Sequence, residues 1–183
     1  GTSPLKTIFR LFAIACIPAY FLSALWLPID MAVYVVVVLS ALFQMAAWIW
    51  TLSLIWSKRD ALKAALPRTA YVIFGLSLLA FSIKFFLQLG STIPTLSTLA
   101  FGFRPIIIGY LHLVLLGVIS LFIIGYILYN GTIVIRAKTR VGLTLFISGI
   151  ILNELALMVQ GMAAMEYISV ADMNGVLLGI AIL

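Results

Sequence analysis

The sequence predicts an all-α protein that crosses a membrane as a polytopic bundle of helices, and three observations lead to this class. Of the 183 residues, 65% are hydrophobic and only 9% are charged, which leaves too little polar surface for a soluble domain. The hydrophobic residues form runs of about 20 residues, the length that a helix needs to cross the hydrocarbon core. The basic residues gather in short segments between these runs, as in the loops of multi-pass membrane proteins.

Five runs are long enough to be complete spans, and all are predicted as helices because a lipid-exposed backbone must satisfy its own hydrogen bonds. Their bounds are 8–27, 32–56, 69–89, 105–129 and 141–165. A sixth run, 174–183, has only about half the required length, and we expect it to be part of a sixth helix. The prediction is therefore a single transmembrane helical domain over 1–183, with five complete spans and a partial sixth, and a fragment of a longer chain.

The basic residues predict the orientation of the bundle. Of the eleven lysines and arginines, nine lie in segments that this topology places on one side of the membrane. They are Lys6, Arg10, Lys58, Arg59, Lys63, Arg68, Arg136, Lys138 and Arg140. Since basic loops stay inside the cell, the N-terminus is predicted to be cytoplasmic. The net charge of +6 therefore reflects topology first and binding of anionic lipid second, and predicts no nucleic-acid partner.

Smaller features refine this scheme. The uncharged segment 91–102 is expected to fold against the outer surface. Asn130 and Gly131 are typical of a helix stop with glycine at the C-cap. Cys16, the one cysteine, has no internal partner for a disulfide and is expected to be a small core residue.

Seven polar residues interrupt the predicted spans, where ionisable and amide side chains are costly and deserve a functional hypothesis. They are Gln44, Lys84, Gln88, His112, Asn153, Glu154 and Gln160. From the helical rise, Lys84, His112 and Glu154 lie roughly 8, 10 and 16 Å below the outer ends of their spans. If the third, fourth and fifth spans are neighbours, we predict a Lys84–Glu154 ion pair with His112 nearby, because opposite charges keep each other ionised in a low dielectric.

Structural roles compete with this hypothesis. Lys84 is near enough to the outer boundary to extend its ammonium group to the interface, and Gln44 and Asn153 are typical of hydrogen bonds between helices. A stripe of small and polar residues is expected to pack the fifth span against a neighbour. It comprises Gly142, Gly149, Asn153, Ala156 and Gln160. His112, the only histidine, is either a hydrogen-bonded core residue, a proton carrier or a ligand.

The segments FGFRPIIIGYLHLVLLG (101–117) and GLTLFISGIILNELALMVQG (142–161) carry a resemblance. They resemble the C-terminal half of an uncharacterised family of bacterial polytopic membrane proteins, which implies a location in the inner (plasma) membrane of a bacterium. More distantly, the YLHLVLLG helix resembles helices of haem–copper oxidase catalytic subunits and of NnrS-type membrane proteins. The resemblance implies that His112 is a ligand of haem or copper, and His112 is the one candidate for a metal site.

This chain departs from that pattern because haem with two axial histidines, or a histidine-ligated copper centre, needs more than one histidine. A haem or copper site would have to be completed by another domain or subunit. Methionines at helical spacing on the fifth span, Met158, Met162 and Met165, could supply ligands but are more typical of a core.

Three functions remain open, and no catalytic residue is assigned because the nucleophile, phosphate-loop and metal motifs are missing from the sequence. The first is a module of a larger bacterial membrane assembly of respiratory type, with His112 as ligand or proton relay. The second is a transporter or channel segment with an outward-facing pocket around Lys84, His112 and Glu154. The third is a structural subunit whose polar residues pack helices. The expected partners are the lipid bilayer and other membrane subunits or the rest of the same chain.

Overall fold

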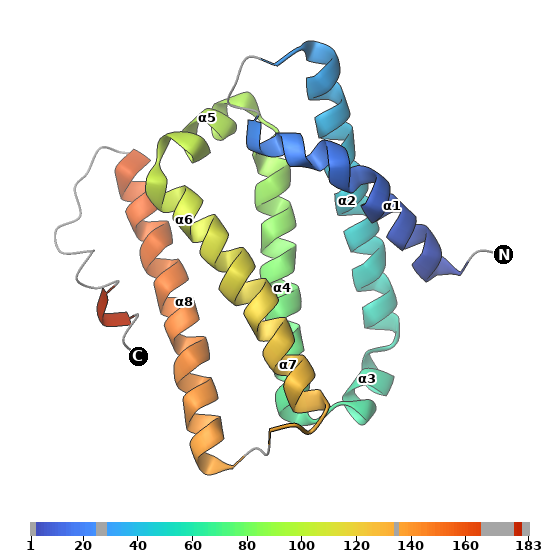
Figure 1. Cartoon of the computed structure of the whole chain (residues 1–183), viewed down its shortest axis with the longest axis vertical. Helices are drawn as coiled ribbons and strands as arrows, with labels where there is room; N and C mark the ends of the chain where they lie inside the picture. Colours follow the sequence, from blue (N-terminus) through green and yellow to red (C-terminus); the bar gives the residue numbers. More distant parts are fainter. Residues whose placement is uncertain (1–2, 25–28, 134–135, 166–177, 181–183) are drawn as a thin grey trace. The chain divides into compact units, whose positions relative to one another are not determined.

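The computed structural model describes residues 3–24, 29–133, 136–165 and 178–180, and every element within them is helical (Figure 1). Within these described ranges, five helical stretches are long and apolar enough to cross a membrane, which confirms the five predicted helices of spanning length. They are Pro4–Leu22, Met31–Ser57, Arg68–Gly90, Arg104–Tyr129 and Ala137–Ala163. The predicted partial span, 174–183, lies outside the described residues except for a helical piece at 178–180.

The helical elements follow one another with short connections. They are α1 (Pro4–Ala19), the 3-10 helix η1 (Tyr20–Ala24), α2 (Met31–Ser57), α3 (Arg59–Ala65), α4 (Arg68–Gly90), α5 (Pro94–Gly102), α6 (Arg104–His112), the π-helix η2 (Leu113–Ser120), α7 (Leu121–Tyr129) and α8 (Ala137–Met165). The fourth predicted span is thus a continuous helix of three segments, α6, η2 and α7.

Two spans begin about four residues earlier than their apolar runs. The first begins at Pro4, since proline suits the first turn of a helix, where its missing N–H is not needed. The fifth begins at Ala137, so that Lys138 and Arg140 belong to the helix and not to the preceding loop. Hydropathy marks where the membrane begins, whereas the helix itself extends further into the polar boundary.

The connections expected to be loops are partly helical. Within the uncharged segment 91–102, residues Pro94–Gly102 form α5, and Ser97 in this helix is fully buried. The hydroxyls of Ser91 and Thr92 donate to the carbonyls of Gln88 and Leu89 at 2.7 Å each, which satisfies two of the last carbonyls of α4. The predicted stop at the end of the fourth span is confirmed, because Gly131 has φ 68° directly after α7.

The described chain forms two compact units, each with its own small core. Unit 1 comprises 1–62 and 82–100, and unit 2 comprises 63–81 and 101–183, so that α4 contributes its first part to unit 2 and its second part to unit 1. In unit 1, α1 packs on α2, and the buried cluster consists of Leu22, Val37 and Ala41. Cys16 is exposed in this unit, so its expected core position is wrong.

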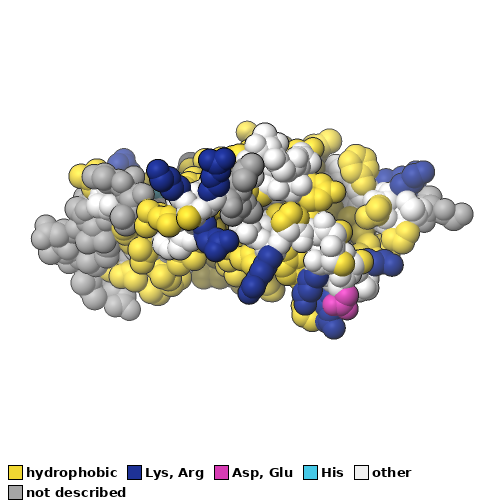
Figure 2. Space-filling view, turned by 90° about the horizontal axis from the view of Figure 1, so that it is seen from below, with side chains coloured by type: hydrophobic (Ala, Val, Ile, Leu, Met, Phe, Trp, Pro, Cys, Tyr) yellow, Lys and Arg dark blue, Asp and Glu magenta, His cyan; other side chains and the backbone are white. Residues whose placement is uncertain are grey.

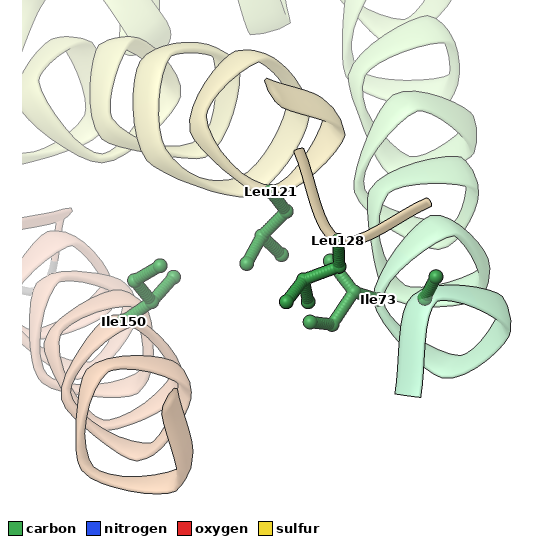
Figure 3. Packing of buried hydrophobic residues seen from close by; sticks show 5 residues of the cluster. Ile73, Leu121, Leu128 and Ile150 are labelled. Atoms are coloured by element: carbon green, nitrogen blue, oxygen red, sulfur yellow. The ribbon is translucent and has the colours of Figure 1, made fainter. Parts of the chain in front are cut away.

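In unit 2, buried side chains from α4, α7 and α8 converge (Figure 3). The cluster consists of Ala70, Ile73, Leu121, Leu128 and Ile150. Glycine allows α4 and α7 to approach closely, because a Cβ placed on Gly125 would lie 3.0 Å from the ring of Phe74. Unit 2 is therefore held by close helix packing around a narrow apolar core.

The face of α8 that packs inside unit 2 differs in part from the predicted stripe. Gly142 is exposed and has nothing near its missing Cβ, whereas Ile150, Leu157 and Gly161 are buried. The other four residues of the predicted stripe, Gly149, Asn153, Ala156 and Gln160, are half-buried. A Cβ placed on Gly149 would lie 3.9 Å from the carbonyl oxygen of Ile180, and Asn153 bonds to His112. The stripe is therefore confirmed in part, with Gly142 as its exposed member.

Candidate functional site

The polar residues of unit 2 lie where α6 packs against α8. Two close approaches define the antiparallel register of these helices. A Cβ placed on Gly161 would lie 3.1 Å from Ile106, and one placed on Gly109 would lie 3.6 Å from the Cβ of Leu157. One turn further along α6, this register brings His112 opposite Asn153.

His112 and Asn153 form a direct hydrogen bond. The Nδ2 atom of Asn153 lies 2.8 Å from Nδ1 of His112. Because an amide nitrogen can only donate, Nδ1 accepts, and the proton of the neutral imidazole ring is on Nε2. The amide therefore selects one tautomer of the ring, and both side chains are half-buried.

Glu154 follows Asn153 directly and presents its carboxyl group to α6. Its Oε2 atom lies 4.0 Å from the position that a Cβ on Gly109 would occupy, so the absent side chain of Gly109 leaves room for the carboxyl. Its Oε1 atom is buried and has no hydrogen-bond partner among the described residues. Gly109 precedes His112 by three residues, so both lie on one side of α6. The Glu154 carboxyl, next to Gly109, and the His112 imidazole are therefore on the same side of this helix, about one helical turn apart.

A π-helix begins immediately after His112. Over Leu113–Ser120 the backbone bonds five residues back, and the Leu121 N–H reaches the carbonyl of Leu116. Two hydroxyls support this segment, since Ser120 donates to Leu115 O and Ser77 of α4 donates to Val118 O, each at 2.9 Å. Within helices, π-helical segments occur often at functional sites, where they change which way side chains point.

A second polar cluster lies in unit 1, between α2 and the end of α4. Lys84 donates to Oε1 of Gln88, and Nε2 of Gln88 donates to Oε1 of Gln44 at 2.6 Å. The ammonium group of Lys84 also lies 4.3 Å from the ring centroid of Phe85. Trp48 adds a bond from α2 to α4, with Nε1 donating to Ser82 Oγ at 3.1 Å.

The two clusters divide the predicted site. Gln44, Lys84 and Gln88 come together in unit 1, whereas His112, Asn153 and Glu154 come together in unit 2. The Lys84–Glu154 pair stays a prediction, because Lys84 belongs to unit 1 and Glu154 to unit 2. Gln160 is half-buried on α8, seven residues after Asn153, outside the His112 hydrogen bond.

The described donors do not form a haem or copper site of the kind that the resemblance implies. Among the residues that the structure describes, no three His, Cys, Asp or Glu side chains come together. Met158 and Met162 are 56% and 53% exposed, so they are not the core residues that were predicted, and the side chain of Met165 lies outside the described part. In addition, a ligating histidine usually donates from its other ring nitrogen, whereas Nδ1 of His112 accepts.

Sequence reasoning missed one residue of this site, Ser77. Sequence reasoning placed Gly109 on the same side of the fourth span as His112, from their spacing of three residues, but it did not predict that Gly109 lies next to the Glu154 carboxyl. Ser77 gives no signal in the sequence, because its partner is a backbone carbonyl of another helix. Comparison with protein families, with curated proteins and with solved structures finds no match to this chain.

Proposed function

We propose that this chain is the membrane-embedded module of a larger bacterial assembly and that His112, Asn153 and Glu154 form a proton-relay site in it. The proposal places the chain in the inner membrane with a cytoplasmic N-terminus, and the three residues in the outer half of the bilayer. The observation that carries it is the buried Oε1 atom of Glu154, which has no partner among the described residues.

A buried carboxyl oxygen without a donor costs free energy in apolar surroundings. A proton, or a water that brings one, would remove this cost when it reaches Oε1. Ionisable groups inside a membrane are rare, and they commonly belong to proton or ion pathways. Glu154 therefore supplies a binding position for a proton, and Gly109 keeps the space in front of the carboxyl open.

The His112–Asn153 pair supplies a second position. In the neutral ring, Nδ1 accepts from the amide and Nε2 carries the proton. If the ring takes up a second proton, Nδ1 also becomes a donor, and the Asn153 amide must turn so that its oxygen accepts. The ring and the amide thus have two matched arrangements, one for each protonation state, as a relay requires.

A structural role is the second candidate, and the unit 1 cluster favours it for the residues concerned. Gln44, Gln88 and Lys84 satisfy each other's hydrogen bonds between α2 and α4. Such bonds hold membrane helices together without binding a substrate. A transporter or channel with one pocket around Lys84, His112 and Glu154 is the wider alternative, and it differs from the relay in making Lys84 part of the path.

Proton flux into vesicles tests the proposal. The purified chain is reconstituted into proteoliposomes that contain a pH-sensitive dye, and a potassium gradient with valinomycin provides the driving potential. We expect wild-type protein to change the internal pH faster than empty vesicles, and Glu154→Gln to lower the rate about 100-fold, as for loss of a proton-transfer group.

Lys84→Met separates the relay from the wider pocket. The relay predicts wild-type flux for this variant, whereas a pocket that includes Lys84 predicts a loss comparable to that of Glu154→Gln. Size-exclusion chromatography confirms that each variant is folded. Equal flux in wild-type and Glu154→Gln vesicles would contradict the proposal.

A further inference from the structure

A groove in unit 2 lies far from the proton site, at the end where α4 and α8 begin. Its volume is about 410 Å³, within the size range of small-molecule sites. Eight residues line it, four from the start of α4 and four from the start of α8. They are Arg68, Thr69, Val72, Ile73, Arg140, Leu143, Thr144 and Ile147.

The rim of the groove, where the two helices begin, is cationic. Arg68 is the first residue of α4, and Arg140 lies in the first turn of α8. Thr69 stands beside Arg68, with a hydroxyl of the kind that donates to phosphate oxygens, whereas the hydroxyl of Thr144 donates to the carbonyl of Arg140 at 3.0 Å. Both helices begin at this end, so their dipoles add partial positive charge to that of the guanidinium groups. Together these groups suit a phosphate.

The inner part of the groove is apolar. Val72, Ile73, Leu143 and Ile147 lie three to seven residues further into their helices than the arginines, or about 4–11 Å deeper along the helix axes. Ile73 is also part of the buried core of unit 2. A ligand that fills the groove therefore meets charge at one end and hydrocarbon at the other, which are the two parts of a phospholipid.

Nothing acidic in the described part of unit 2 neutralises the rim. The described acidic residue of this unit is Glu154, fourteen residues after Arg140 on α8 and thus about 21 Å along the helix. Figure 2 shows Lys and Arg side chains next to hydrophobic ones on the face seen from below. The positive charge of the rim attracts an anion, and the exposed hydrophobic side chains next to it favour contact with lipid.

We infer that this groove binds one anionic phospholipid, with its phosphate between Arg68 and Arg140 and its acyl chains along the apolar residues. The site is independent of the proton relay. Two guanidinium groups on two helices recognise the phosphate better than scattered lysines would, because guanidinium donates two parallel hydrogen bonds to one phosphate. The bound lipid would tie the start of α4 to the start of α8.

Native mass spectrometry tests the inference. Protein is reconstituted with phosphatidylcholine and phosphatidylglycerol, extracted in mild detergent, and weighed with its retained lipid. We expect one phosphatidylglycerol per wild-type chain, and about 30-fold weaker retention in the double variant Arg68→Gln/Arg140→Gln, from the usual contribution of each basic residue. Both arginines are exposed, so the variant is expected to fold, and its helix content is checked by circular dichroism.

The matched control is Lys63→Gln/Lys138→Gln, which removes the same charge from exposed positions outside the groove. Lys138 lies two residues before Arg140 and therefore on another side of α8. We expect this control to retain the lipid. Equal loss in both double variants, or no retained lipid on wild-type protein, would overturn the inference. Displacement by millimolar inorganic phosphate as readily as by free phosphatidylglycerol would identify a phosphate site and also overturn it.

Discussion

The two polar clusters of this protein differ in how completely their hydrogen bonds are satisfied. In unit 1, the ammonium of Lys84, the amide of Gln88 and the carbonyl of Gln44 form a chain of donors and acceptors. In unit 2, His112 and Asn153 are paired, but Glu154 keeps a buried oxygen without a described partner. A completed cluster stabilises helix packing, whereas an incomplete one retains the capacity to bind a proton or a ligand.

Each unit contains one buried side-chain oxygen without a described partner. The comparison of the units therefore depends on the chemical group to which this oxygen belongs. In unit 1 it is the hydroxyl of Ser97, and in unit 2 it is a carboxyl oxygen of Glu154. An unpaired neutral hydroxyl costs far less than an unpaired carboxylate. Only the second is expensive enough to call for a functional explanation.

The largest expected effect separates the clusters by function. His112→Phe keeps a ring of similar size but removes both nitrogens, and we expect proton flux to fall about 100-fold. The free energy of unfolding should change by no more than about 1 kcal/mol, because one interhelical hydrogen bond is lost. Vesicle flux and unfolding in mixed micelles measure the two effects. Wild-type flux in this variant would remove His112 from the relay.

The second largest effect is expected on the free energy of unfolding, from a change in the unit 1 cluster. Gln88→Leu leaves Gln44 without its donor and removes the acceptor that Gln88 offers to Lys84. We expect the free energy of unfolding to fall by about 1–2 kcal/mol while flux stays at the wild-type rate. Phe86→Leu, at a 68% exposed position of the same helix, is the matched control and should change little. A flux defect in Gln88→Leu would break the division between the clusters.

A smaller effect concerns the tautomer of His112. Asn153→Leu removes the donor to Nδ1, so the ring is no longer held with its proton on Nε2. Nitrogen NMR of ¹⁵N-histidine should show one tautomer in wild-type protein and a mixture in the variant. The expected loss in unfolding free energy is about 0.6 kcal/mol. An unchanged spectrum would show that Asn153 does not select the tautomer.

The smallest effect is expected at Gly109. A Cβ there would lie 3.6 Å from Leu157 and 4.0 Å from Oε2 of Glu154, which are ordinary contacts. Gly109→Ala should therefore change the unfolding free energy by less than about 0.5 kcal/mol and leave proton flux intact. Gly109→Leu, in contrast, fills the space before the carboxyl and should lower flux. If alanine already abolishes flux, the carboxyl is packed more tightly than the contacts indicate.

The spans were predictable because run length and hydropathy decide whether a helix can cross a membrane. The ends of the helices were less predictable than the spans, since Pro4 and the basic residues near Ala137 extend two helices beyond their apolar runs. The π-helix could not be predicted, because residues 105–129 are evenly hydrophobic and its support comes from Ser77, which is distant in sequence.

For the candidate site, the sequence predicted only the depth of the polar residues along their helices. Helical rise placed Lys84, His112 and Glu154 in one layer of the outer half of the membrane, and Asn153 directly precedes Glu154. Rise does not give the rotation of each helix about its axis, which brings Asn153 to His112 and Gln44 to Gln88. Rotation depends on packing contacts such as that of Gly161 with Ile106, which a single sequence does not reveal.

Infrared difference spectroscopy on the reconstituted protein tests the relay most directly, because it observes the Glu154 carboxyl itself. Over a series of pH values in water and heavy water, the carboxyl band of Glu154 should appear and vanish reversibly. The band should be missing in Glu154→Gln and displaced in His112→Phe, since the two groups share one side of α6. A wild-type spectrum without a titrating carboxyl band that Glu154→Gln removes would contradict the account.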